Sequence, residues 1–159
     1  MTTKNAKIED FQDNLLREVV VNYGTKSSQR FHFNKPEQVA EFARSVLIDN
    51  SREHFIALYL NTRHLVIGYS LLAIGTVNMV SIHPREIYHR ALLAGAVAFV
   101  VVHNHPSNDL EPSTEDCTMT ELLARGSRII GLNFLDHLII SDTCFYSFRD
   151  SQPSLFSRT

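Results

Sequence analysis

Residues 96–102, AVAFVVV, form an unbroken run of small, β-branched and aromatic apolar residues. Such a run is typical of a central β-strand that is covered on both faces, because a strand with one exposed face alternates apolar and polar residues. The next residues along the chain, 103–106, read HNHP. The sequence therefore predicts a buried strand that delivers two histidines at its end.

The neighbouring apolar segments predict the rest of a sheet. HFIALYL, 54–60, and LVIGYSLLAI, 65–74, are separated by a short polar turn. They predict adjacent antiparallel strands, of which the first is buried on both faces. The other segments that predict strands are EVVVNY and QRFHFN (18–23 and 29–34, a hairpin), MVSI (79–82), and the stretches 128–142 and 144–148.

Three helices are predicted from apolar residues spaced three and four apart. The first begins at Asn34 and Glu37, which resemble a capping box. The second lies between Pro84 and Gly95, and the third spans 113–125 and is expected to end at the glycine that follows. The apolar residues that define the first and third helices are Val39, Phe42, Ala43, Val46 and Leu47, and Met119, Leu122 and Leu123.

Strands and helices alternate without a strict strand–helix–strand period. This order predicts an α/β fold with one mixed central β-sheet flanked by helices, rather than a doubly wound sheet. A length of 159 residues suits a single domain. We expect a polar lead-in over residues 1–17, the domain over residues 18–150 and a flexible tail over residues 151–159.

Composition and charge exclude several classes of protein. A formal net charge of -2 argues against strong direct binding to DNA. The two cysteines, Cys117 and Cys144, lack metal-type CxxC spacing and suit a reducing compartment. The first residues lack the apolar core of a signal peptide, and no apolar run approaches the ~20 residues that cross a bilayer. We expect a soluble cytoplasmic protein with no membrane association.

The polar stretch that follows the buried run, HNHPSNDLEPSTED, has the composition of a metal site. If the strand continues through His103 and His105, both imidazoles lie on one face, with Cα atoms about 6.5 Å apart. Pro106 then ends the strand and lets the chain turn back. A catalytic zinc ion needs three protein ligands and one open position. The acidic residues that could supply the third ligand are Asp109, Glu111, Glu115 and Asp116.

A simpler interpretation exists for the same residues. Ser113 and Asp116 are spaced as a helix N-cap and an acidic first-turn residue. Two histidines at a strand end are also often only solvated or hydrogen-bonded. The combination of a buried strand, HxH, a short acidic loop and a helix start favours metal binding. Cys117 is expected to be a buried thiol and His137 a hydrogen-bonded structural histidine, and neither is expected to be a ligand.

Several motifs carry a resemblance to a known family. HNHPSNDLEPSTED matches the JAMM signature, which is HxH, seven residues, then SxxD. The motifs EHF (53–55), GTVN (75–78), HPRE (83–86) and LDH (135–137) resemble the RadC-like branch of the JAB/MPN metalloprotease superfamily. The similarity covers about residues 18–150. It implies the three-layer arrangement of that superfamily, which is like that of cytidine deaminases.

The resemblance implies a role for each matching residue. His103, His105 and Asp116 match the zinc ligands of the family, with water as the fourth ligand. Glu53 matches its upstream glutamate, which acts as general acid and base through that water. Ser113 matches the serine that hydrogen-bonds the developing oxyanion. The residues alone could not have singled out this glutamate.

Two features depart from the family pattern. RadC-like sequences usually read HNHPSG, whereas Asn108 stands here in place of the glycine. Asparagine tolerates the left-handed conformation that glycine would serve. Full-length RadC proteins also carry an N-terminal helix-hairpin-helix DNA-binding region. This sequence more closely resembles the short stand-alone RadC-like proteins of bacterial mobile elements, which lack that region.

The sequence thus predicts a zinc-dependent hydrolase that acts on a peptide or protein substrate, as a metallopeptidase or isopeptidase. A second hypothesis is a non-catalytic module that binds DNA-repair or replication proteins and has only a structural metal. A metal-dependent nuclease is the third, because activated water can also attack phosphorus. A zinc deaminase is excluded, since its H-x-E and P-C-x-x-C motifs are absent. The oligomeric state is left open.

Overall fold

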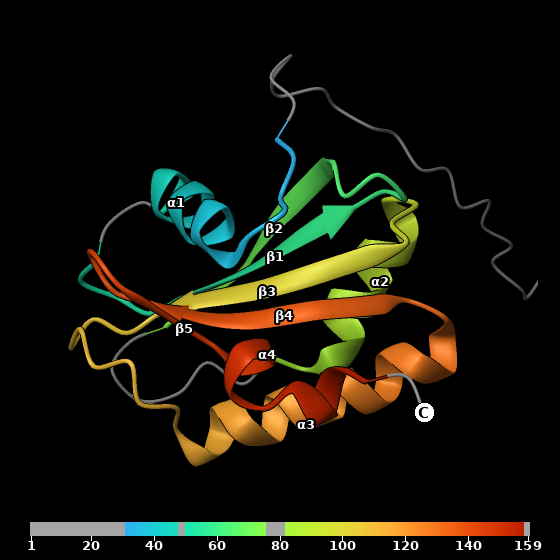
Figure 1. The fold of residues 1–159 in the computed structure, drawn as a ribbon. Helices are drawn as coiled ribbons and strands as arrows, with labels where there is room; N and C mark the ends of the chain where they lie inside the picture. The colour runs from blue at the N-terminus through green and yellow to red at the C-terminus, as the bar shows by residue number, and fades with distance from the viewer. Residues whose placement is uncertain (1–30, 48–49, 76–81, 158–159) are drawn as a thin grey trace, which may run out of the picture.

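A five-stranded mixed sheet forms the centre of the molecule (Figure 1). The computed structural model describes residues 31–47, 50–75 and 82–157. In these residues β3 and β4 pair in parallel, whereas the other neighbouring strands pair antiparallel, which confirms the predicted mixed sheet. The strands, in their order across the sheet, are β2 (Val66–Ile74), β1 (His54–Leu60), β3 (Ala98–Asn104), β4 (Asn133–Ile140) and β5 (Phe145–Ser147).

Helices cover both faces of the sheet. Strands β1 and β3 are buried along their whole length, as their apolar runs predict. One face packs under α1 (Pro36–Val46). The other face packs under α2 (Pro84–Leu93) and α3 (Thr114–Ile130), on the opposite side of the sheet in Figure 1. The result is the three-layer arrangement that the resemblance implies.

The start of α1 differs from the predicted capping box. The N-cap is Lys35, in extended conformation and without a side-chain cap. A residue before proline avoids the helical region, and Pro36 therefore fixes the boundary. The backbone N–H of Asn34 donates to Oε1 of Gln38, at 2.9 Å. The predicted capping box between Asn34 and Glu37 was therefore wrong.

Helix α3 does not end at Gly126, as the sequence suggests, but continues to Ile130. Gly131 ends it with a left-handed φ of 74°. A side chain at Gly126 would collide with the ring of Tyr88 from α2. The Tyr88 hydroxyl donates to the carbonyl of Leu123, at 2.8 Å. Gly126 therefore serves the close approach of two helices and not the end of one.

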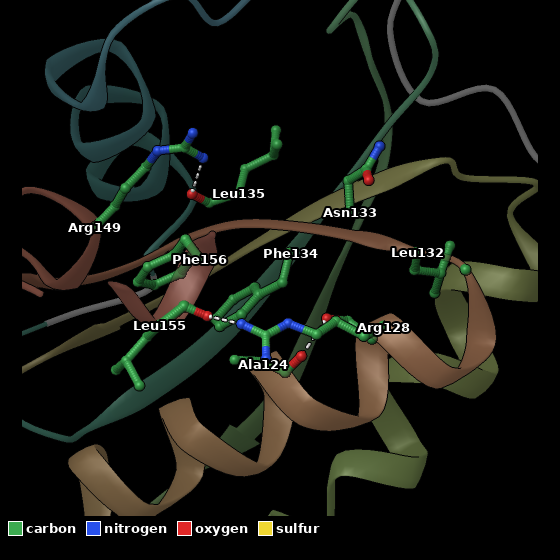
Figure 2. A pocket seen from close by; sticks show the side chains of 11 residues that line it. Ala124, Arg128, Leu132, Asn133, Phe134, Leu135, Arg149, Leu155 and Phe156 are labelled. Atoms are coloured by element: carbon green, nitrogen blue, oxygen red, sulfur yellow. Dashed lines mark hydrogen bonds between the residues drawn. The ribbon is translucent and has the colours of Figure 1, made fainter. Parts of the chain in front are cut away.

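Short helices include most of residues 151–157, which belong to the segment expected to be a flexible tail. Residues Phe148–Ser151 form α4, and Pro153–Phe156 form a 3-10 helix. Arg128 of α3 donates to the carbonyls of Leu155 and Ser157, at 2.8 and 2.9 Å. This segment lines a cavity of about 630 Å³ between α3 and β4 (Figure 2). Contacts between distant segments, absent from the local sequence pattern, order the C-terminus.

Some predictions fall on other parts of the chain. The lead-in over 1–17, the strand over 18–23 and most of the strand over 79–82 lie outside the described residues. His32 lies in the second predicted strand of the hairpin and forms an isolated antiparallel bridge with Leu65. In the described part of the chain, no helix has the length and apolar character that crossing a bilayer requires.

Candidate metal centre

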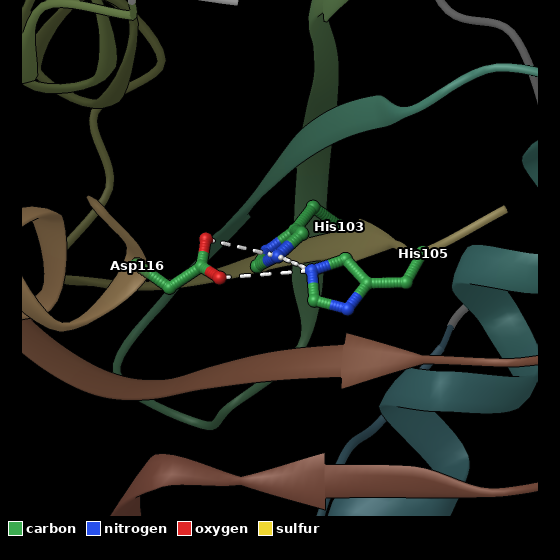
Figure 3. Close-up of side chains that lie close together, drawn as sticks. All are labelled: His103, His105 and Asp116. Carbon is green, nitrogen blue, oxygen red and sulfur yellow. Dashed lines mark hydrogen bonds and ion pairs between the residues drawn. The ribbon is translucent and has the colours of Figure 1, made fainter. Parts of the chain in front are cut away.

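The two histidines lie at the end of the buried strand β3. His103 is the second-to-last residue of β3 and is 1% exposed, and His105 follows the strand and is partly buried. Their spacing of two places both rings on one side of the chain. Helix α3 starts nearby with Ser113 as its N-cap, which places Asp116 in the first turn. Figure 3 shows the carboxylate and both imidazoles directed toward one another.

The three side chains converge closely. Nε2 of His103 lies 3.0 Å from Nε2 of His105 and 3.1 Å from Oδ1 of Asp116. Nε2 of His105 lies 3.6 Å from the other carboxylate oxygen. One ligand atom from each residue lies within 4.8 Å of the other two. The structure thus brings together the three residues that the sequence singles out as ligands.

The donors and acceptors around His105 suit a bound cation. Nδ1 of His105 lies 2.6 Å from the carbonyl oxygen of Asp109. A carbonyl only accepts, and Nδ1 therefore carries the proton, so that a neutral His105 turns the lone pair of Nε2 toward the site. The carboxylate of Asp116 also offers only lone pairs. Two acceptors that face each other are stabilised by a positive ion between them, and the His103, His105 and Asp116 group could bind a metal ion.

Electrostatic coupling fixes the charge of this cluster. Burial raises the pKa of Asp116, but the interaction of its carboxylate with the rings of His103 and His105 outweighs this effect and holds the pKa far below its usual value. The nearby Asp116 carboxylate raises the pKa of His105, against the opposing effect of burial. Asp116 is therefore ionised at neutral pH, as a metal ligand must be.

Ser113 has the capping role that the simpler interpretation assigns to it. The backbone N–H of Asp116 donates to Oγ of Ser113 at 3.1 Å, and the N–H of Ser113 donates to Oδ2 of Asp116 at 2.9 Å. These reciprocal bonds form a capping box. The Ser113 hydroxyl also donates to Oδ2, at 2.6 Å. The cap therefore orients the carboxylate, and its hydroxyl lies directly beside the candidate ligand set.

Glu53 lines the same groove as two of the candidate ligands. It directly precedes β1 and lines a groove of about 580 Å³ together with His105, Ser113 and Asp116. The structure thus brings the upstream glutamate to the candidate metal site. The apolar residues that line the groove are Phe55, Ile82, Pro84, Met119 and Leu122.

Comparison with known proteins agrees with this arrangement. A family model described as "RadC-like JAB domain" matches residues 33–153, which is most of the chain. The chain belongs to the RadC-like JAB domain family. Three similar proteins are the UPF0758 proteins of Shouchella clausii (40% identical over 117 residues), of a Geobacillus species (42% over 121) and of Desulforamulus reducens (43% over 114).

These matches cover unequal shares of the two chains. They include 74%, 76% and 72% of this chain, but 51%, 54% and 50% of the respective relatives. The RadC-like chain therefore spans about half the length of the curated relatives it matches. What the similarity supports is membership of the family over the domain that carries the candidate metal centre.

Sequence reasoning missed the role of Asn104 in the RadC-like domain. Its side chain is buried, and its Oδ1 accepts from the backbone N–H of His54 at 2.8 Å. Its Nδ2 donates to the carbonyl of Arg52 at 3.0 Å. Asn104 thus holds the backbone on both sides of Glu53. Strand alternation gives a signal for this role, because it turns Asn104 away from His103 into a face where a polar group needs a partner.

Two other expectations agree with the structure. Asn108 has the expected left-handed conformation, with φ 59°. His137 is fully buried and hydrogen-bonded, as expected for a structural histidine. Burial lowers its pKa well below the usual value. Cys117, expected to be buried, is only partly so.

Proposed function

We propose that this RadC-like domain is a zinc-dependent hydrolase of peptide or isopeptide bonds. The observation that carries the proposal is the convergence of His103, His105 and Asp116 beside a groove that Glu53 and Ser113 line. Two imidazole nitrogens and a carboxylate are a frequent ligand set of catalytic zinc. When bound there, zinc would polarise the substrate carbonyl and lower the pKa of a water molecule toward ~7.

The protein groups supply the proton transfers. Glu53 accepts a proton from the attacking water and returns it to the departing amine, which restores the glutamate. Ser113 donates a hydrogen bond to the oxyanion as it develops. Its hydroxyl donates to Asp116 in the structure, and this bond must be exchanged for one to the substrate. The capping bonds from backbone N–H groups keep Asp116 oriented during the exchange.

The charge of the groove favours a peptide over a nucleic acid. The carboxylates of Glu53, Glu115 and Asp116 line it, and the chain has a net charge of -2. Phosphodiesters bind through cationic side chains, and acidic walls repel them. The two cysteines are free thiols, which suits the cytoplasmic location that we also propose. A partner from DNA repair or replication would then be a protein substrate rather than a DNA ligand.

The proposal is tested with purified unsubstituted protein, His103→Ala and Glu53→Gln. We expect about one zinc per chain in the unsubstituted protein and in Glu53→Gln, and none in His103→Ala, by elemental analysis. Glu53→Gln should cleave peptide and isopeptide substrates at least about 100-fold more slowly, because it lacks the general base. Glu111→Gln, an exposed loop residue, is the matched control and should retain full activity.

Three results would contradict the proposal. Unchanged zinc content in His103→Ala would place the metal elsewhere, and unchanged cleavage by Glu53→Gln would remove this residue from the reaction. Cleavage of single- or double-stranded DNA that depends on Glu53, with no peptide cleavage, would identify a nuclease instead.

A further inference from the structure

His137 lies behind the metal centre without facing the groove. It belongs to β4, the strand that pairs in parallel with β3, and it is fully buried. Its ring stacks on Phe148, with centroids 4.8 Å apart and an interplanar angle of 12°. One nitrogen, Nε2, lies 2.9 Å from Nδ1 of His103, and the other, Nδ1, lies 2.6 Å from Oγ1 of Thr120. Both nitrogens are therefore occupied by protein groups.

Thr120 sets the direction of these hydrogen bonds. Its hydroxyl lies 2.6 Å from the carbonyl oxygen of Asp116, one turn earlier in α3. That carbonyl can only accept, and the single hydroxyl proton of Thr120 is therefore used in this bond. Oγ1 of Thr120 must then accept from His137, which requires a proton on Nδ1 of His137.

The same direction of hydrogen bonding extends from His137 to His103, the candidate metal ligand. The hydrogen-bond partners of the His137 ring are His103 and Thr120, neither of them an anion, and an imidazolium so enclosed would be strongly destabilised. A neutral His137 with a proton on Nδ1 has a lone pair on Nε2. It accepts from Nδ1 of His103, and His103 is left with a lone pair on Nε2, the atom that points at Asp116 and His105.

We propose that Thr120 and His137 are positioning residues that hold His103 in the tautomer able to bind a metal ion. The opposite direction of bonding would put a proton on Nε2 of His103, which would then donate to Asp116 and block ligation. The chain of bonds begins at the backbone of one ligand, Asp116, and ends at the ring of another, so that it links α3, β4 and β3. This inference rests on the metal site of the proposed function, but not on hydrolysis.

The tautomers can be read directly in zinc-free protein. Long-range ¹H–¹⁵N correlation spectra at mildly alkaline pH, with assignments from His103→Ala and His137→Phe, should show Nδ1–H tautomers for both histidines. Thr120→Val removes the hydroxyl and keeps the shape of the side chain. It should shift His103 toward the Nε2–H tautomer and weaken zinc binding about 10- to 100-fold in competition with a chromophoric chelator.

The matched control is Thr120→Ser, which keeps the hydroxyl and should keep both the tautomer and the zinc affinity. An Nε2–H tautomer of His103 in the unsubstituted protein would overturn the inference, as would equal zinc affinity of Thr120→Val and Thr120→Ser. Because the spectra need no active enzyme, this result stays separate from the test of hydrolysis. A protein with the expected tautomers and tight zinc binding but no peptidase activity would support the inference and contradict the proposed function.

Discussion

The two histidines of the metal centre have opposite surroundings, although a single residue separates them. The side chain of His103 is 0% exposed and is held by side chains from β4 and α3. The side chain of His105 is 18% exposed and is held by a backbone carbonyl within its own loop. We call these the strand side and the loop side of the site.

The difference separates two requirements of a metal centre. On the strand side, the ring of His103 stacks on that of Phe55, with centroids 5.7 Å apart. This packing fixes a candidate ligand in place without a bound ion. On the loop side, His105 lines the groove with Ser113 and can adjust to an ion or a substrate. Rigidity and access are thus provided by different segments of the chain.

Removal of each histidine should have unequal effects on folding. Both His103→Ala and His105→Ala should abolish stoichiometric zinc binding. His103→Ala should also lower the free energy of unfolding of the zinc-free protein by about 2–4 kcal/mol, because it opens a cavity and leaves Nε2 of the buried His137 without a partner. His105→Ala should change it by less than about 1 kcal/mol. Urea unfolding of both variants in a chelating buffer measures the difference, and equal losses would abolish the distinction between the two sides.

Asn104 extends the strand side to Glu53, and its loss should have the next largest effect. Asn104→Ala leaves the buried N–H of His54 without an acceptor, at a cost of roughly 1–3 kcal/mol. The released segment should lower turnover while zinc content stays near one per chain. Asn50→Ala removes an exposed side-chain partner of Asn104 but keeps its bonds to His54 and Arg52, and it is the control, with the smaller loss of stability. Turnover of Asn104→Ala equal to that of the unsubstituted protein would show that Glu53 needs no such support.

Asn108 tests the loop side, where the smallest effect is expected. Its φ of 59° is costly for alanine and free for glycine. Asn108→Ala should therefore be about 1 kcal/mol less stable than Asn108→Gly, and both should bind zinc within a few-fold of the unsubstituted protein. Thermal unfolding and chelator competition measure the two quantities. A zinc affinity in Asn108→Ala as low as that of Thr120→Val would mean that the loop side is as rigid as the strand side.

Local patterns predicted the elements whose burial is visible in the sequence. The apolar runs gave β1 and β3, and the spacing of HxH and SxxD placed two histidines and a helix start together. The extended conformation of Lys35, the role of Gly126 and the order of the C-terminus all depend on a proline, a tyrosine or an arginine in particular contacts. Local periodicity does not encode such contacts.

In the candidate site too, some residues could be predicted from local patterns and others depend on contacts between distant segments. Glu53 entered only through resemblance, because an acidic residue before a strand has no local feature that marks it as catalytic. Asn104 and Thr120 act through hydrogen bonds to segments 17 to 52 residues away, or to groups that become neighbours only when β3 pairs with β4. Family motifs supply residue identities at these positions, and the folded structure supplies the partners that give them a role.

The parallel pairing of β3 with β4 also orders events during biosynthesis. His103, His105 and Asp116 lie within 14 consecutive residues, and closing so short a loop has a small entropic cost. His137 is 34 residues from His103, and its contact forms only after α3 and β4 have been added to the fold. A nascent chain therefore holds all three candidate ligands before it holds His137, the hydrogen-bond partner of His103. Synthesis of the candidate ligand set and completion of the contacts behind it are separate steps in the life of the chain.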